Sequence, residues 1–287
     1  MLALPALLLS VCPLIQDPPA ADEVLQGLEA QGLKAHKGPC DGDLGPQAHV
    51  AVPEGFYFLD GNNARKLLEQ NRNLTSGTEV GALLHTDGTG SDWWVFFEFS
   101  GDGYVKDDDK DLDADELMEG FQEGNEASNA ERRKRGWPEM KLLGWQKPPF
   151  YDPLTNNLTW SQVIEVEGRR TVNWSTRLLG RQGVMKVDLV LGPEDLDAAL
   201  PAFATLLGGY EFKASHRYAE FSAGDKVAEY GLAALVAGGA GALALKTGLF
   251  AKLWKFLIIP LMAAAAWLKK LFSGSKKPNE DAAGPSA

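Results

Sequence analysis

Short apolar runs and alternating apolar and polar positions predict a series of strands along the middle of the chain. Residues 93–100 (WWVFFEFS) give the strongest signal, since aromatic and β-branched side chains stop at a Gly-Asp-Gly turn. Further strands are predicted at 56–59, 140–145, 158–165, 171–179 and 184–191, with edge strands at 210–212 and 218–221. Because turn-rich links separate consecutive strands, these segments predict an antiparallel meander.

Helical spacing of apolar residues predicts three helices among these strands. Asp60 precedes a short helix over residues 62–70, and Pro193 opens a helix that runs to residue 207. The clearest helix covers residues 113–135, with Asp113 as its cap, acids in its first turn and basic residues in its last. Helices that cover an antiparallel sheet define an α+β fold, to which the C-terminus adds a predicted transmembrane helical segment.

The N-terminus resembles a signal peptide. Residues 1–20 hold an apolar run over 2–15 that is followed by small residues around Ala20, although no Lys or Arg precedes the run. The alternative is a buried N-terminal helix, which Pro5 and Pro13 would interrupt. We therefore predict export of the domain that follows.

Two apolar runs near the C-terminus predict membrane-associated helices. The first, residues 230–245, covers about 24 Å as a helix and reaches the thickness of a bilayer core, roughly 30 Å, if it continues past Lys246 to Ala251. The alternative for this run is a buried core helix. The second run, residues 256–268, either crosses back or lies in the membrane interface, so single-pass and double-pass topologies both stay open.

Charge is distributed unevenly and predicts the orientation of the chain. Residues 1–229 carry 21 Lys and Arg against 37 Asp and Glu, whereas residues 230–287 carry 7 against 2. Lysines that follow the first apolar run favour the cytoplasmic side, which places the acidic body outside the cytoplasm, in the periplasm of a Gram-negative cell. An acidic body repels phosphate backbones, so nucleic acid is not an expected partner.

These observations predict four segments. They are a signal peptide (1–20), an exported α+β domain (21–222), a membrane-anchoring helical region (227–270) and a disordered polar tail (271–287). The expected partners are the lipid bilayer and either a second copy or another envelope protein. A row of small residues on one helix face permits such packing: Ala234, Gly238 and Ala242.

The acidic stretch before the clearest helix is the candidate metal site. Seven of the ten residues from 107 to 116 are acidic, and oxygen ligands at alternating positions suit calcium: Asp107, Asp109, Asp111 and Asp113. An EF-hand loop does not fit, because Leu112 stands where the turn needs Gly and Met118 where a bidentate Glu is required. The alternative, which we favour, is a solvated loop that leads into the helix.

Aromatic and proline residues provide candidates for a ligand or peptide groove. The groove residues are Trp145, Pro148, Tyr151, Trp160, Asn173 and Arg181. Packing at the end of the sheet is the alternative and the favoured interpretation. No zinc motif, phosphate loop, dinucleotide fingerprint or nucleophile elbow is visible, so we predict no cofactor and assign no catalytic residue.

Several motifs follow one another along the chain: GALLHTDGTGSDWWVFFEFSGDGYVKDDD, DADEL, GW with P-x-YD, L-x-W, VNW, LGRQGV and YGLAALVAGGAGALALKTGLF. In this order they resemble a bacterial family, the predicted membrane-anchored proteins of domain-of-unknown-function family 2167. One departure is Trp174, where the family has Tyr. The resemblance implies an exported domain with a C-terminal anchor and supplies no activity or catalytic residue.

We therefore expect a membrane-anchored, extracytoplasmic binding or interaction module. The alternative is an envelope hydrolase of unrecognised type that uses carboxylates such as Asp107 or Asp152 with His85.

Overall fold

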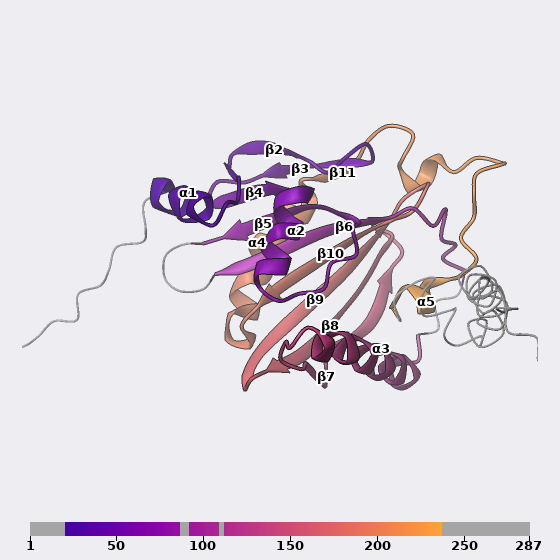
Figure 1. The fold of residues 1–287 in the computed structure, drawn as a ribbon. Helices are drawn as coiled ribbons and strands as arrows, with labels where there is room; N and C mark the ends of the chain where they lie inside the picture. Colours follow the sequence, from indigo (N-terminus) through magenta and orange to yellow (C-terminus); the bar gives the residue numbers. More distant parts are fainter. Residues whose placement is uncertain (1–20, 87–91, 109–111, 237–287) are drawn as a thin grey trace, which may run out of the picture. The chain divides into compact units, whose positions relative to one another are not determined.

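One long antiparallel sheet organises the fold. The computed structural model describes residues 21–86, 92–108 and 112–236, which all belong to one compact unit. Within them, strands pair antiparallel in the order β1-β4-β5-β6-β10-β9-β8-β7 (Figure 1). Their bounds are β1 His36–Lys37, β4 Phe56–Asp60, β5 Glu79–His85, β6 Trp93–Ser100, β7 Lys141–Asp152, β8 Asn157–Val166, β9 Arg169–Leu179 and β10 Val184–Leu191. Two meanders, β4 to β6 and β7 to β10, meet where β6 pairs with β10.

A smaller sheet and a helix cover one face of the long sheet. Strands β2 (Cys40–Asp43), β3 (Ala48–Val52) and β11 (Tyr210–Phe212) pair in the order β11-β3-β2, and α4 (Leu196–Gly208) follows the 3-10 turn η1 (Pro193–Asp195). The main core lies between these elements and the long sheet. Its buried members include Val50, Phe97, Val187, Leu189 and Phe203.

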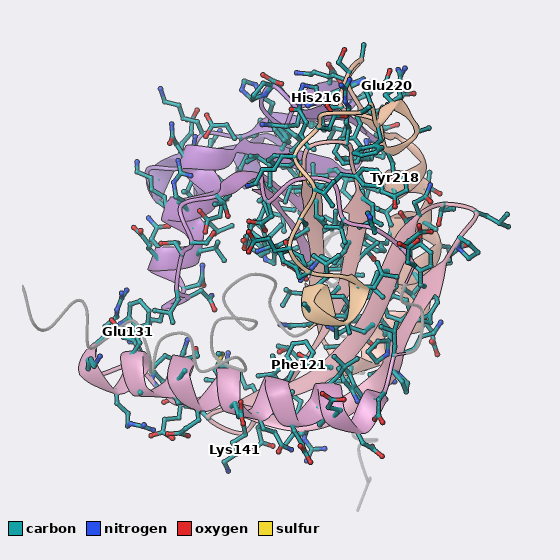
Figure 2. The ribbon with its side chains drawn as sticks, turned by 90° about the vertical axis from the view of Figure 1, so that its right-hand side faces the viewer. Phe121, Glu131, Lys141, His216, Tyr218 and Glu220 are labelled. Atoms are coloured by element: carbon teal, nitrogen blue, oxygen red, sulfur yellow. The ribbon has the colours of Figure 1, made fainter. Side chains whose placement is uncertain are left out.

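The opposite face carries three helices at its two ends. Helices α1 (Ala21–Ala30) and α2 (Gly61–Gln70) pack on β4 and β5 around Leu59 and Leu84. Helix α3 (Ala114–Lys134) lies against β7, with Phe121 among the aromatic residues of β7 and β8 (Figure 2).

Polar side chains fill the part of this face that lies between α2 and α3. Strands β6, β9 and β10 place there the residues that alternate with their core positions. They include Glu98, Asn173, Ser175, Lys186 and Asp188. A band of polar residues therefore crosses the centre of the sheet.

The chain returns to the sheet before the described part ends. After the 3-10 turn η2 (Tyr218–Glu220), Val227 pairs with Tyr104, and the short helix α5 (Leu232–Val236) is buried on its Leu232 and Leu235 side. None of the helices in residues 21–86, 92–108 and 112–236 is long and apolar enough to span a bilayer. Of the predicted small-residue face, Ala234 lies in α5, whereas Gly238 and Ala242 fall outside the described residues.

The predicted α+β class with an antiparallel meander is confirmed, and the three predicted helices are observed. The strand predicted at residues 218–221 is wrong. That segment forms η2 because the backbone N–H of Arg217 donates to Glu220, the Glu220 N–H donates back to Arg217, and Tyr218 stacks on Tyr104. Helix α1 and strands β1, β2, β3 and β5 were not predicted. The signal peptide, the second apolar run and the polar tail lie outside the described residues.

Candidate functional site

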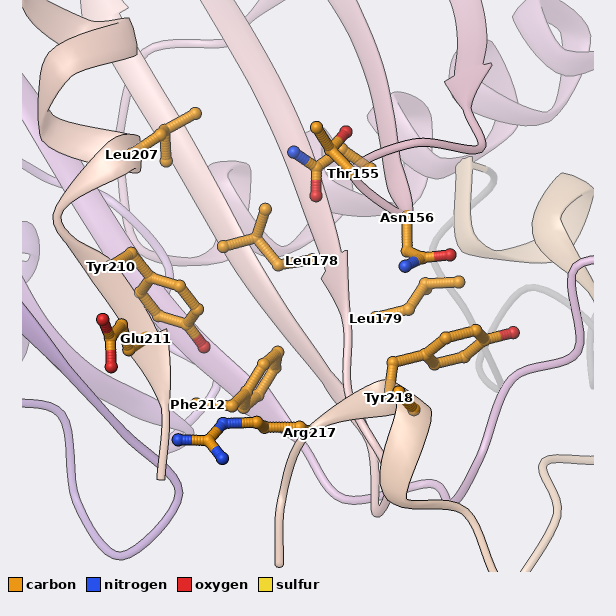
Figure 3. Close-up of a pocket in the computed structure, with 12 residues that line it drawn as sticks. Thr155, Asn156, Leu178, Leu179, Leu207, Tyr210, Glu211, Phe212, Arg217 and Tyr218 are labelled. Atoms are coloured by element: carbon orange, nitrogen blue, oxygen red, sulfur yellow. The ribbon is translucent and has the colours of Figure 1, made fainter. Parts of the chain in front are cut away.

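A pocket of about 620 Å³ opens beside β9 and is called the side pocket here (Figure 3). Four parts of the chain form it: the turn between β7 and β8, the end of β9, the junction of α4 with β11, and the segment that contains η2. Its lining residues are Thr155, Asn156, Asn157, Leu178, Leu179, Leu207, Tyr210, Glu211, Phe212, Arg217, Tyr218 and Ala219.

The base of the side pocket is apolar and aromatic. Tyr210 and Phe212 project from the same side of β11 and meet edge to face, with ring centroids 5.3 Å apart. A close approach at Gly180 makes room for Phe212, because a Cβ at this position would lie only 2.7 Å from the Phe212 ring. The Tyr210 Oη is buried without a hydrogen-bond partner among the described residues, and burial raises the pKa of this phenol. The pocket therefore holds an unsatisfied hydroxyl beside an apolar surface.

Polar groups surround this base. Arg217 is exposed over 56% of its side chain and lies 3.8 Å from the Glu220 carboxylate, so its guanidinium is accessible at the rim. Glu211 and the amides of Asn156 and Asn157 add acceptors and donors. An apolar base with a few polar groups at the edge is the usual construction of a site for a small molecule or a peptide.

A cluster of tyrosines around Asp107 lies next to the side pocket and contributes Tyr218 to its lining. The Tyr151 hydroxyl donates to Asp107 at 3.0 Å, and the Tyr218 Oη lies 3.0 Å from the Val105 carbonyl oxygen and 3.3 Å from Asp107. Tyr104 stacks on Tyr218 with centroids 4.4 Å apart. Burial, followed by the Asp107 contact, raises the pKa of Tyr151, so its hydroxyl stays protonated and donates to the carboxylate.

An ion pair holds η2 in place. Both Nε and Nη2 of Arg181 donate to the Asp225 carboxylate, at 2.7 and 2.8 Å, and the Arg181 backbone N–H donates to the His216 carbonyl at 2.9 Å. The Arg181 hydrogen bonds and the backbone N–H of Ser222 hold the pKa of Asp225 below its usual range. Arg181 is one of the predicted groove residues; it does not line the pocket but bonds to the segment on both sides of η2, which does.

The structure distributes the predicted groove residues among different surroundings. Trp145 donates its indole N–H to the Ala114 carbonyl at 3.0 Å and meets the edge of Phe121. Trp160 is buried beneath the Arg177 guanidinium, which lies 4.6 Å from its ring. Tyr151 belongs to the Asp107 cluster described above.

Of the other two, Pro148 is exposed on β7, at the edge of the long sheet, and Asn173 is half-buried in the polar band on β9. None of the six predicted groove residues lines the side pocket. Trp145 and Trp160 nevertheless come together around Phe121 beneath α3.

The acidic candidates for a metal have structural roles where they are described. Asp113 caps α3 by accepting the backbone N–H groups of Asp115 and Glu116, both at 3.0 Å. Asp107 accepts the Tyr151 hydroxyl, and residues 109–111 lie outside the described part of the chain. The described residues contain no group of three or more His, Cys, Asp or Glu that could hold a metal ion.

The residues of the hydrolase alternative lie far apart. His85 pairs with Trp93, the first residue of β6. Ser100, the last residue of β6, lies roughly 23 Å from Trp93 along the strand. Asp107 follows Ser100 in the chain, at that other end of the strand. Asp152 closes the β7–β8 turn by accepting from the Leu154 N–H and the Thr155 hydroxyl. The structure therefore does not bring His85 together with Asp107.

Sequence reasoning missed the residues that form the base of the side pocket. A signal was present, because Tyr210 and Phe212 are two positions apart in a predicted strand and so share one face. The partner surface from Leu178, Leu207 and the β7–β8 turn depends on tertiary packing, which no local pattern specifies.

These features define an α+β domain built on one long antiparallel sheet, with a pocket at its side. The chain belongs to the family described as "Protein of unknown function (DUF2167)", whose model matches residues 36–269. No curated protein matches the chain.

Two solved structures are similar to part of the chain. Cyanobacterial PsbP (CyanoP) from Synechocystis sp. PCC 6803 is 13% identical, with a TM-score of 0.37, over 63% of this chain and 92% of that one. PA94 from Pseudomonas aeruginosa, a protein of unknown function described as a putative regulator, is 14% identical, with a TM-score of 0.22, over 55% of this chain and 87% of that one. At these TM-scores neither structure bears on the fold or the function.

Proposed function

We propose that the protein is a binding module that takes its ligand in the side pocket. The observation that carries this proposal is the buried Tyr210 hydroxyl, which has no partner among the described residues and lines a pocket of about 620 Å³. A buried polar group without a partner costs stability unless something else satisfies it. A ligand that brings a hydrogen-bond acceptor to Tyr210 satisfies that group and is stabilised in return.

The lining restricts the chemistry of this ligand. Leu178, Leu207 and Phe212 offer an apolar surface, so the ligand has an apolar body. Its polar end meets Arg217 and the Asn156 amide at the rim. A short peptide segment or a small organic molecule with one acceptor group has this composition.

We also propose that the module acts outside the cytoplasm, held at the cell membrane. The support comes from sequence: the signal-like start, the apolar runs near the C-terminus and the lysines that follow the first run. A binding module held at a membrane meets ligands of the cell envelope. No second function is proposed, because the groups of the hydrolase alternative lie apart.

Site-specific photocrosslinking in the native membrane tests the ligand site. A benzophenone amino acid replaces Ala219, an exposed residue of the pocket lining, and in a matched control replaces Ala127, an exposed residue of α3. We expect a discrete adduct at position 219 only, and its loss when Leu207→Trp fills the pocket. Identical adducts at both positions, or an adduct that survives Leu207→Trp in a folded protein, would contradict the proposal.

A further inference from the structure

A second cavity lies on the opposite face of the long sheet, in the polar band between α2 and α3. This central cavity has a volume of about 130 Å³ and is bounded by β6, β8, β9 and β10, by Phe121 of α3, and by Tyr230 and the last residues of α5. Trp160 forms part of its wall. It shares no residue with the side pocket.

The charged residues that line the central cavity are both cationic. They are Arg177 and Lys186, and none of the described lining residues is acidic. The whole chain has a formal net charge of −11, so a cavity lined by cations alone differs in sign from the chain as a whole. Positive groups on the wall of a cavity favour an anionic occupant.

The nearby carboxylates are already engaged by other donors. Asp188 accepts from the Ser175 hydroxyl and from one guanidinium nitrogen, Nη1, of Arg177. Asp102 accepts from the Ser100 and Tyr230 hydroxyls. Hydroxyl groups therefore occupy some of the acceptor positions of both carboxylates. N–H groups of Arg177 and Lys186 are left to donate to an occupant of the cavity.

Among the described residues, Lys186 makes one ion pair, which is long, and it also interacts electrostatically with the Asp102 carboxylate. Its Nζ lies 3.8 Å from the Glu98 carboxylate, which also accepts from the hydroxyls of Ser76, at 3.1 Å, and Thr78, at 3.3 Å. A separation of 3.8 Å is too long for a hydrogen bond. The ammonium can therefore donate to a group inside the cavity.

A buried amide points to an occupant independently of charge. Gln162 is 7% exposed and lines the cavity, and its Nε2 is buried with no hydrogen-bond partner among the described residues. Buried donors are almost always paired in folded proteins. An oxygen of a ligand is the complement that this amide lacks.

The adjoining space beneath α3 is apolar. A further cavity of about 150 Å³ shares Phe121 and Gln162 with the central cavity and is lined by Leu142 and Ile164. Gly124 also lines it, and a Cβ at this position would meet no atom within 4 Å. Gly124 is exposed, so its Cβ position faces open space at the edge of this cavity.

We infer that the two adjoining cavities form a binding site for a small amphiphilic anion. Its carboxylate or phosphate group lies at Lys186, Arg177 and the Gln162 amide, and its short hydrocarbon part lies beneath α3 beside Leu142 and Ile164. This site is separate from the side pocket and does not depend on the proposed function.

Binding of six-carbon probes to the full-length protein tests the site by calorimetry. Hexanoate and hexyl phosphate carry the two head groups, while hexanol and hexylamine have the same chain without a negative charge. We expect the anions to bind at least about tenfold more tightly than the other two, and the stronger anion identifies the head group. Equal binding of hexanol or hexylamine, or no binding of either anion, overturns the inference.

Three variants keep the result specific to this site. Lys186→Gln should weaken anion binding about tenfold or more, whereas Lys141→Gln, with its similar 3.7 Å pair to Glu165 outside the cavities, should not change it. Gln162→Leu should also weaken binding, yet it should leave the melting temperature of the empty protein unchanged or raised, because it removes an unpaired buried amide. Unchanged binding in Lys186→Gln contradicts the proposal even if Gln162→Leu does not fold.

Discussion

Four tyrosine hydroxyls are withdrawn from water, and this predicts an unusual alkaline titration. Burial raises the pKa of each of them: Tyr151, Tyr210, Tyr218 and Tyr230. A phenol in the unfolded chain ionises near pH 10. Because the folded pKa values are higher, the stability that they contribute is fully present below about pH 10 and is lost as the pH rises toward those values.

Ultraviolet titration of tyrosinate measures this effect. The chain has six tyrosines, so we expect no more than two to ionise near pH 10 while the protein is folded, and all six in denaturant. Tyr210→Phe should not reduce the amplitude near pH 10, because Tyr210 does not contribute to it. Ionisation of three or more tyrosines near pH 10 with the fold intact would show that these hydroxyls are accessible.

The Arg181–Asp225 ion pair predicts the opposite behaviour in acid. The Arg181 hydrogen bonds, with the Ser222 N–H, lower the pKa of Asp225 below its unfolded value of about 3.9. The stability contributed by Asp225 is therefore fully present above about pH 4 and is lost as the pH falls through its folded pKa. Asp225→Asn should melt at a lower temperature at pH 7 and lose less on acidification than the unsubstituted protein.

Thermal melts between pH 7 and pH 3 provide the measurement. Glu54→Gln is the matched control, since Glu54 is exposed and its side chain makes no hydrogen bond or ion pair with the described residues. Its melting profile should follow that of the unsubstituted protein. If Asp225→Asn does the same, the ion pair does not hold the segment that contains η2.

At the scale of the elements, two glycines predict opposite responses to the same substitution. Gly124 lies inside α3, where a Cβ meets nothing within 4 Å, so Gly124→Ala should stabilise the protein by roughly 0.5–1 kcal/mol through helix propensity. At Gly183, just before β10, a Cβ would overlap the Ser100 carbonyl oxygen. Gly183→Ala should therefore destabilise by about 1–3 kcal/mol.

Denaturant unfolding of both variants measures whether the free energy of unfolding rises for Gly124→Ala and falls for Gly183→Ala. Gly27→Ala in α1, also with nothing within 4 Å, should behave like Gly124→Ala. A neutral result at Gly183 would mean that β6 and β10 can separate there without cost, against the register that pairs Val184 with Ser100.

The elements divide into those that local sequence predicts and those that it does not. Helix α3 was predictable because Asp113 caps it and its charges follow the helix dipole. Strand β5 was not, because Gly81 interrupts its apolar pattern. That glycine exists for a tertiary reason: a Cβ there would lie 2.8 Å from Leu44 and 3.0 Å from Phe58.

At the scale of the whole molecule, the candidate sites were predictable only in part. Trp160 and Asn173, chosen as groove residues, both line the central cavity. Their cationic neighbours Arg177 and Lys186 look like ordinary exposed positions in a strand. The pairing of β9 with β10 brings these two residues together, and the pairing of β8 with β9 places Gln162 on the same face, so the sequence could not indicate the cavity.

Charge distribution makes a prediction for the whole chain. The acidic body and the lysines that directly follow the first apolar run predict that the described domain lies outside the cytoplasm. The side on which the last lysines of the chain lie depends on whether residues 256–268 cross the membrane. A full-length chain in which Cys12 and Cys40 are replaced by Ser can carry a single new cysteine at either of two places. Ala127→Cys is exposed on α3, and Ser275→Cys follows the second apolar run.

Labelling of bacterial spheroplasts with a membrane-impermeant maleimide measures both positions. We expect Ala127→Cys to react in intact spheroplasts, because export would place α3 outside the membrane. If the second run does not cross, Ser275→Cys should react only after lysis, and if it crosses, both should react before lysis. Reaction of Ala127→Cys only after lysis would contradict export, and the ligands of both pockets would then have to be cytoplasmic.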